Sequence, residues 1–142
     1  MRTLFDTSAL VAVLIQIHPA HDRVMSWLRQ AKIGTRLIAA HSLAELYSIL
    51  TTYPIRPRIS PAAAQQMIDQ SILSTFEIVQ LSGVDYTTVI AYLARQGITG
   101  GATYDALILS AAVKAGADQI VTLNERHFRR IRPDLAENII AP

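Results

Sequence analysis

A stretch near the amino terminus, residues 3–10 with the sequence TLFDTSAL, constrains the fold of this chain more than any other. Leu4 and Phe5 are typical of a short buried strand, and Asp6 stands where that strand should end. The apolar run that follows, Ala9 to Ile15, is long enough for helical turns. The sequence therefore predicts a carboxylate at a strand-to-helix junction, which is where ligands bind in open α/β sheets. An aspartate in this place is also a good helix N-cap, and this stretch alone does not separate the two interpretations.

Strand and helix signals alternate along the rest of the chain. Helices are predicted where apolar residues recur at helical spacing, and strands where short apolar runs lie between turn residues. Strands are expected at 4–5, 36–40, 76–81, 119–122 and 138–140, and helices at 9–15, 20–32, 42–53, 60–74, 84–96 and 103–115. Such alternation implies an α/β fold of four or five strands, with a parallel sheet covered by helices on both faces.

Two local signals refine the middle of this pattern. Ser42-Leu-Ala-Glu45 matches a capping box, which would begin the third helix at Ser42. Pro54, Pro57 and Pro61 break the chain within a few residues, so the helices on either side are expected to form a hairpin around the sequence PIRPR.

Composition limits the kinds of protein that the chain can be. A length of 142 residues with 51% hydrophobic content predicts a single domain, 1–142, with one packed core. No apolar run approaches the roughly 18 residues of a membrane span, and there is no cysteine, so a soluble protein of the reducing cytoplasm is expected. The net charge of +2 argues only weakly for nucleic acid.

Four side chains that carry oxygen ligands occupy equivalent places in the predicted fold. Asp6 follows the first strand, and Glu45 lies in the first turn after the second. Asp105 lies in the first turn of a late helix, and Asn124 follows the strand that ends at Thr122. Each of them alone is explained by helix capping or by a favourable charge at a helix amino terminus. Because parallel strands bring their carboxyl ends to one edge, the four can instead converge on one small volume.

Converging carboxylates repel one another unless a cation joins them. A site of oxygen ligands, without cysteine and without a zinc-like spacing of its four histidines, favours a hard ion, Mg²⁺ or Mn²⁺. Among the histidines, His41 is the one placed to approach the site, although a surface or packing role is the simpler interpretation.

With these residues in place, the sequence resembles the PIN-domain ribonucleases, and within them the VapC-like toxins of bacterial toxin–antitoxin pairs. The resemblance covers essentially the whole chain. It rests on Asp6-Thr7-Ser8 with Leu10, on Glu45 in HSLAELYSIL, on Asp105 in GGATYDALIL, and on Thr122 to Phe128. It implies a PIN-like three-layer sandwich with a central parallel sheet, acidic residues that hold Mg²⁺ or Mn²⁺, and cleavage of single-stranded or looped RNA. It also implies a homodimer and a small antitoxin whose tail covers the active site.

The resemblance also implies roles for individual residues. Asp6 and Asp105 would bind the metal directly, and Glu45 would bind it or hold a water on it. The family often has aspartate where this chain has Asn124, which makes Asn124 a weak ligand or a residue that supports one. Ser8 and Thr122 carry hydroxyls near the same edge, where they would orient water or phosphate or act as ordinary turn hydroxyls.

Surfaces for partners follow from charge and from apolar helix faces. Arg126, Arg129 and Arg130 fall close together after Asn124 and are predicted to contact the RNA backbone, because guanidinium groups match phosphate oxygens. A solvated helix face is the other interpretation of this cluster. Partner proteins are expected on helix 20–32 and on the hairpin around PIRPR, unless those apolar faces pack inward.

Rival functions are weighed on the same residues. A haloacid-dehalogenase-type phosphatase requires a second aspartate two residues after the first, and this chain has Ser8 there. A receiver domain requires an aspartate after a middle strand, which here ends in Val79-Gln80-Leu81. The remaining alternative is a PIN scaffold that binds RNA or protein without cutting. Which RNA bond is cut depends on stacking and base-edge contacts that the sequence does not locate.

Overall fold

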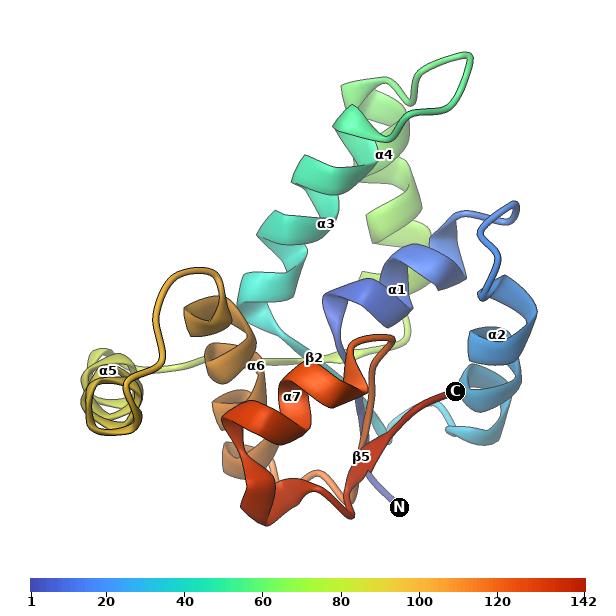
Figure 1. Ribbon diagram of the computed structural model, residues 1–142. Helices are drawn as coiled ribbons and strands as arrows, with labels where there is room; N and C mark the ends of the chain where they lie inside the picture. Colours follow the sequence, from blue (N-terminus) through green and yellow to red (C-terminus); the bar gives the residue numbers. More distant parts are fainter.

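The computed structural model describes residues 1–142 and is built on a five-stranded sheet in which all paired strands are parallel. The strands are β1 (Thr3–Phe5), β2 (Arg36–Ala39), β3 (Glu77–Val79), β4 (Gln119–Val121) and β5 (Ile139–Ile140). Their order across the sheet is β3-β2-β1-β4-β5, so the chain fills one side of β1 first and the other side later (Figure 1). The predicted α/β fold with a parallel sheet is confirmed, with five strands.

Seven α-helices connect and cover these strands. They are α1 (Thr7–Leu14), α2 (His21–Gln30), α3 (Ala40–Thr52), α4 (Pro61–Ile68), α5 (Gly83–Gln96), α6 (Ala102–Lys114) and α7 (Glu125–Ile131). A π-helical turn, η1 (Asp69–Leu73), continues α4, and a 3₁₀ turn, η2 (Pro133–Leu135), follows α7. None of these helices combines the length and the hydrophobicity needed to cross a membrane.

The sheet separates two hydrophobic clusters because successive strand residues point to opposite faces. Phe5, Ile38 and Val121 belong to one cluster, together with residues of α1, α2, α3 and α4. Leu4 and Ile120 belong to the other, together with residues of α5, α6 and α7. Both faces of the sheet are therefore covered, as the near-continuous apolar character of its strands requires.

The helical hairpin around PIRPR is confirmed, since α3 and α4 pack against each other and extend away from the sheet (Figure 1). The predicted capping box at its beginning is wrong. Helix α3 begins at Ala40, directly after β2, so Ser42 lies inside the helix and Glu45 lies in its second turn. Ser42 is fully buried, with its Oγ 2.9 Å from Thr7 Oγ1. The helix predicted over 60–74 is confirmed in its extent, because α4 continues without a break into the π-helical turn that ends at Leu73, and it is α-helical only to Ile68.

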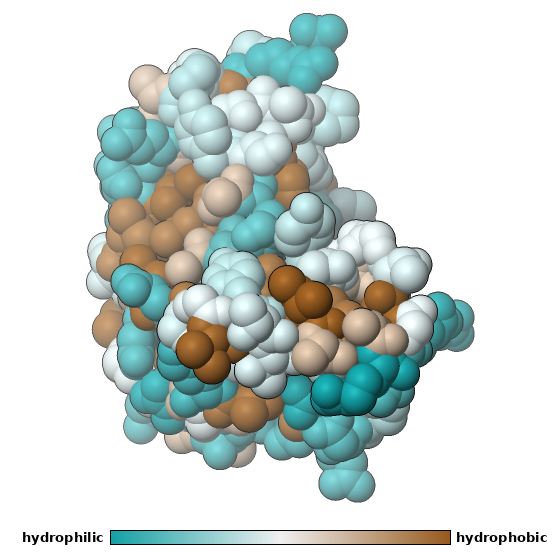
Figure 2. Space-filling view, turned by 90° about the vertical axis from the view of Figure 1, so that its left-hand side faces the viewer, coloured by the Kyte–Doolittle hydropathy of each residue, from teal (hydrophilic) through white to brown (hydrophobic).

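Helix α5 lies at one side of the molecule and packs on α6. It buries Val89 and Leu93 against that neighbour but leaves Val84 and Ile90 exposed. Figure 2 shows hydrophobic residues standing out between hydrophilic ones on this side of the molecule. This helix therefore carries an apolar face that the protein itself does not cover.

Candidate active site

Asp6 lies at the carboxyl end of β1, beside the carboxyl end of β4. Its backbone N–H donates to the carbonyl oxygen of Val121, which continues the pairing of these two strands. The order of the sheet reverses at β1, and such a switch point is where open α/β sheets bind ligands. Asp6 is also the N-cap of α1, because its Oδ1 accepts a 2.8 Å hydrogen bond from the N–H of Ala9. The capping and site interpretations of this residue are thus compatible.

Two hydroxyl groups hold the Asp6 carboxylate in place. Ser8 Oγ donates to it, at 2.7 Å from Oδ1 and 2.9 Å from Oδ2, and Thr122 Oγ1 donates to Oδ2 at 2.6 Å. Each hydroxyl accepts a backbone N–H in turn, from Leu123 to Ser8 and from Asn124 to Thr122. Ser8 and Thr122 therefore link α1 to the segment after β4 and fix the orientation of the carboxylate between them.

The pKa of Asp6 is raised from 3.8 to about 6. The largest cause is burial, since the residue is only 2% exposed and a charged carboxylate is poorly solvated there. Hydrogen bonds from Thr122, Ala9 and Ser8 lower the pKa, while the negative charge of Asp105 raises it. Without a cation, the site therefore disfavours the ionised form of Asp6.

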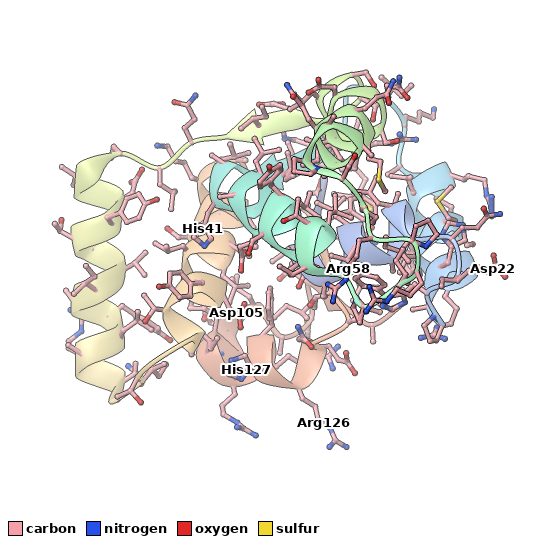
Figure 3. All side chains as sticks on the ribbon, turned by 90° about the horizontal axis from the view of Figure 1, so that it is seen from above. Asp22, His41, Arg58, Asp105, Arg126 and His127 are labelled. Carbon is pink, nitrogen blue, oxygen red and sulfur yellow. The ribbon has the colours of Figure 1, made fainter.

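Asp105 lies in the first turn of α6, as predicted, and approaches the same end of the sheet. Its Oδ2 is 3.2 Å from Nε2 of His127 on α7, and Figure 3 shows these two side chains pointing toward each other. Burial raises the pKa of Asp105, the neighbouring His127 lowers it, and the negative charge of Glu45 raises it. The charge of Asp105 thus acts on Asp6 and is itself acted on by Glu45.

Glu45 reaches the site from α3. Its Oε1 accepts a 2.8 Å hydrogen bond from Thr7 Oγ1, in the first turn of α1. His41, one turn earlier on α3, places its Nε2 3.8 Å from the same oxygen. Glu45 is therefore held by contacts between helices and not by the capping box that its sequence context predicted.

The segment after β4 places Asn124 and the arginines differently. Asn124 is exposed at the N-cap of α7, and its side chain makes no capping hydrogen bond. Arg126 and Arg130 are exposed, and Arg126 points outward from α7 (Figure 3). The guanidinium of Arg129 instead donates to the carbonyl oxygens of Ala136 (3.3 Å) and Ile139 (2.7 Å). Arg129 thus secures the C-terminal segment against α7.

The structure brings Asp6, Glu45 and Asp105 to one end of the sheet but does not present a finished metal site. No three acidic or histidine side chains lie close enough to hold a metal ion between them. The reason is that each carboxylate is turned toward its own partner: Asp6 to hydroxyls, Glu45 to Thr7 and Asp105 to His127. This arrangement separates like charges, and the assignment of metal ligands stays a prediction.

His127 is the site residue that sequence reasoning missed. It lies three residues after Asn124 on α7, a spacing that puts two residues on the same side of a helix. His41 has the corresponding relation to Glu45, four residues earlier on α3. Helical spacing from an acidic or amide candidate is therefore the signal that the sequence carries for these two histidines, which lack the spacing of a zinc site.

The parallel sheet, the helices on both faces and the acidic group beside the central strand define this protein as a PIN domain, and the PIN-domain family model matches residues 3–132. The chain belongs to this family and, within it, to the VapC-type ribonuclease toxins. Ribonuclease VapC40 of Mycobacterium tuberculosis is 38% identical over 112 residues, which cover 79% of each chain. Ribonuclease VapC27 of the same species is 33% identical over 113 residues, covering 80% of this chain and 78% of the relative.

Solved structures share the fold at lower identity. The structure of FitAcB from Neisseria gonorrhoeae matches with a TM-score of 0.73 and 21% identity, over 99% of this chain and 97% of the other. A toxin–antitoxin complex from Klebsiella pneumoniae matches with a TM-score of 0.68 and 20% identity, over the same shares of the two chains. At such identities these likenesses show the fold.

Proposed function

We propose that this protein is a Mg²⁺- or Mn²⁺-dependent endoribonuclease, the toxin of a toxin–antitoxin pair, which hydrolyses phosphodiester bonds in single-stranded or looped cytoplasmic RNA. The observation that carries the proposal is the meeting of Asp6, Glu45 and Asp105 at the switch point of the sheet, where their charges act on one another. The ribonuclease relatives support the same reaction class.

The side chains present fit a hard divalent ion. All the candidate ligands are oxygen atoms, as such ions prefer. The carboxylate of Asp6 offers about four acceptor positions. Ser8 has one hydroxyl proton to share between the two oxygens, so the donors from Ser8, Ala9 and Thr122 leave one position for a cation. Asp6 and Asp105 would hold the ion, with Glu45 and Asn124 at its border.

A bound ion of this kind neutralises charge on the phosphodiester and makes water nucleophilic. The protein's own groups supply orientation and proton transfer. Ser8 and Thr122 keep the Asp6 carboxylate from rotating. Glu45 uses Oε1 to accept from Thr7, which leaves Oε2 to take a proton from the attacking water. His127, whose Nε2 lies 3.2 Å from Oδ2 of Asp105, would give a proton to the oxygen that leaves phosphorus when the P–O bond breaks.

The direct test is a Mg²⁺ titration of RNA cleavage by the purified protein. Cleavage should require Mg²⁺ or Mn²⁺ and disappear with a chelator. Glu45→Gln should lower the rate at least about 100-fold at saturating Mg²⁺, since the amide keeps the hydrogen bond from Thr7 but accepts no proton. Near-normal cleavage by this variant, or cleavage that ignores the chelator, would refute the proposed mechanism.

Asn124→Asp belongs to the same titration and reports on the position where the resemblance to PIN-domain ribonucleases leads us to expect an aspartate. If Asn124 borders the metal, the added negative charge should bring half-maximal cleavage to a lower Mg²⁺ concentration. The backbone N–H of Asn124 already anchors this residue to Thr122, so the substitution does not have to reorder the segment. Coinciding titrations would mean that the Asn124 side chain does not border the metal.

The second candidate function is a PIN scaffold that binds RNA or a protein without cutting. Two observations favour it: each of the three carboxylates contacts a different partner, and position 124 carries a neutral amide. This alternative predicts that RNA binds equally well with and without divalent ions and stays intact. The titration above therefore separates the two functions.

For the RNA-binding surface we propose the exposed arginines of α7. Arg126 and Arg130 face solvent beside the site, whereas Arg129 is engaged with the C-terminal backbone. Replacing Arg126 and Arg130 with glutamine should reduce the slope of log affinity against log salt by about one unit or more, because two phosphate contacts would be lost. Arg23→Gln with Arg29→Gln, two exposed changes on α2, is the control. An unchanged slope would return α7 to the role of a solvated face.

We also propose an antitoxin partner and a homodimer. The toxin–antitoxin complexes among the structural neighbours support the antitoxin. Helix α2 turns Val24 and Leu28 inward, so its apolar stripe is used by the core. The hairpin, with a groove that includes Tyr47 and Pro61, remains the better surface for a partner. Sedimentation at micromolar concentration should show a dimer, and a monomer would contradict this proposal.

A further inference from the structure

Beside the acidic group, two aromatic rings form a stack between α3 and α6. The rings of His41 and Tyr104 have centroids 5.1 Å apart and planes inclined by only 4°. Both residues line a hollow of about 360 Å³, together with Ala44, Glu45, Ser48 and Ile49. This volume is within the range of small-ligand sites, about 300–1,000 Å³. Tyr104 directly precedes Asp105, and Figure 3 shows His41 and Asp105 on the same side of the molecule.

The stack is not explained by packing of the core. Tyr92 is an example of a tyrosine with a structural role, in contrast to Tyr104. It is half-buried, and its hydroxyl donates to the carbonyl oxygen of Ile131 at 2.6 Å. Tyr104 belongs to neither hydrophobic cluster and is 50% exposed. His41 covers one face of its ring, and Nε2 of His41 approaches Glu45. A broad aromatic surface is therefore held in a fixed orientation next to the cluster of three acidic residues, Asp6, Glu45 and Asp105.

We propose that Tyr104, backed by His41, is a stacking surface for one unpaired base of the RNA, next to the bond that is cut; this inference rests on the proposed ribonuclease function. An exposed aromatic ring binds any base through its π-face, and each such stack contributes about 1–3 kcal/mol, or about 5- to 150-fold in affinity. Because Glu45 lines the same hollow as Tyr104 and His41, a base on this ring would place its own backbone beside the carboxylates. Paired RNA cannot present a free base face, so the surface selects single-stranded or looped substrates.

The test is cleavage of a short single-stranded RNA by variants of Tyr104. Tyr104→Leu should lower kcat/KM about 5- to 150-fold, while Tyr104→Phe should stay near the wild type, because only the ring is needed. Half-maximal Mg²⁺ should be unchanged in both variants. Tyr86→Leu, an equally simple change of a 41% exposed tyrosine on α5, is the matched control and should have no effect. Melting curves establish that each variant is folded.

Substrates with one abasic nucleotide at each position around the cut identify the stacked base. At that position the missing base should slow the wild type as much as Tyr104→Leu does, and should not slow Tyr104→Leu further. If the losses of rate caused by the abasic nucleotide and by Tyr104→Leu multiply at every position, the proposal is overturned. A Tyr104→Leu protein as active as the wild type would overturn it as well.

A binding measurement separates this inference from the proposed activity. RNA that carries the fluorescent base 2-aminopurine at each position in turn is titrated with the Asp6→Asn protein. Its fluorescence should be quenched at one position, and this quenching should be lost in the double variant Asp6→Asn with Tyr104→Leu. If the wild type cuts no RNA, the ribonuclease proposal fails, while this quenching still decides the stacking surface. Equal quenching with and without Tyr104 would reject it.

Discussion

Replacing Asp6 with asparagine is expected to reduce RNA cleavage at least about 100-fold while leaving the protein folded. Asparagine is as good an N-cap as aspartate, so its carbonyl oxygen can keep the hydrogen bond from Ala9 that begins α1. The variant loses the negative charge that we propose binds the metal. Cleavage at saturating Mg²⁺ measures the loss, and circular dichroism checks the fold.

The same substitution should change how stability depends on pH in the metal-free protein. The pKa of Asp6 is about 6 in the folded protein and close to 3.8 in the unfolded chain, so the folded state binds this proton more tightly. The stabilisation is complete below the unfolded pKa and is lost as pH rises through about 6. The free energy of unfolding should therefore fall between about pH 4 and 6, by up to roughly 3 kcal/mol from this group. Asp6→Asn should lack this decrease.

Denaturant unfolding in the presence of a chelator, at several values between about pH 4 and 8, measures this difference. Asp22→Asn, an exposed change on α2, should keep the wild-type pH dependence. Added Mg²⁺ at neutral pH should stabilise the wild type and not Asp6→Asn, because a ligand stabilises the state that binds it. Parallel pH profiles for the wild type and Asp6→Asn would contradict the assignment of a raised pKa to this carboxyl.

Asp105→Asn should combine a similar loss of cleavage with a gain in stability of the metal-free protein. Burial and the charge of Glu45 both raise the pKa of Asp105, and the opposing effect of His127 does not cancel them. The ionised form is therefore unfavourable in the folded state, and a neutral amide relieves that cost. We expect a rise of a few degrees in melting temperature at neutral pH without divalent ions, and a smaller rise or none with saturating Mg²⁺.

A double-mutant cycle tests the cause of this gain. In a His127→Gln background the favourable contact of Asp105 is gone, so Asp105→Asn should stabilise the protein more than it does in the wild type. Asp69→Asn, an exposed change in the π-helical turn, should leave both melting temperature and cleavage unchanged. A lower melting temperature for Asp105→Asn would mean that the folded protein stabilises the ionised carboxylate of Asp105, and it would contradict this prediction.

The sequence alone determined the fold class and the location of the candidate site. Alternation of short apolar strands with helices specified a parallel sheet, and such a sheet brings the carboxyl ends of its strands to one edge. A helix that leads into a parallel strand begins at that same edge, so Asp105 in the first turn of α6 could be expected near Asp6, although the two are 99 positions apart in the sequence. Helix ends marked by strong local signals, such as Ser60 before Pro61 and Gly97 after α5, were also predictable.

Local signals failed where a contact from another element outweighed them. Ser42 and Glu45 have the spacing of a capping box, but α3 starts at Ala40 and both side chains turn to Thr7 of α1. Arg129 has the same sequence context as its neighbours, yet the carbonyl oxygens of Ala136 and Ile139 bind it. A sequence pattern describes what a residue can do with its near neighbours, and in these cases a distant partner decided.

Only the tertiary structure decided how the site is arranged. Thr122 donates to Asp6 across 116 residues because β1 and β4 pair in one register, with Phe5 opposite Val121. A shift of that register by one residue would turn the side chains to the other face of the sheet. The burial that raises the pKa of Asp6, and the contact between Asp105 and His127, likewise arise from packing of α1, α6 and α7 around this edge. Residue types and their order specify which groups can meet, whereas strand register and helix packing set their distances and charges.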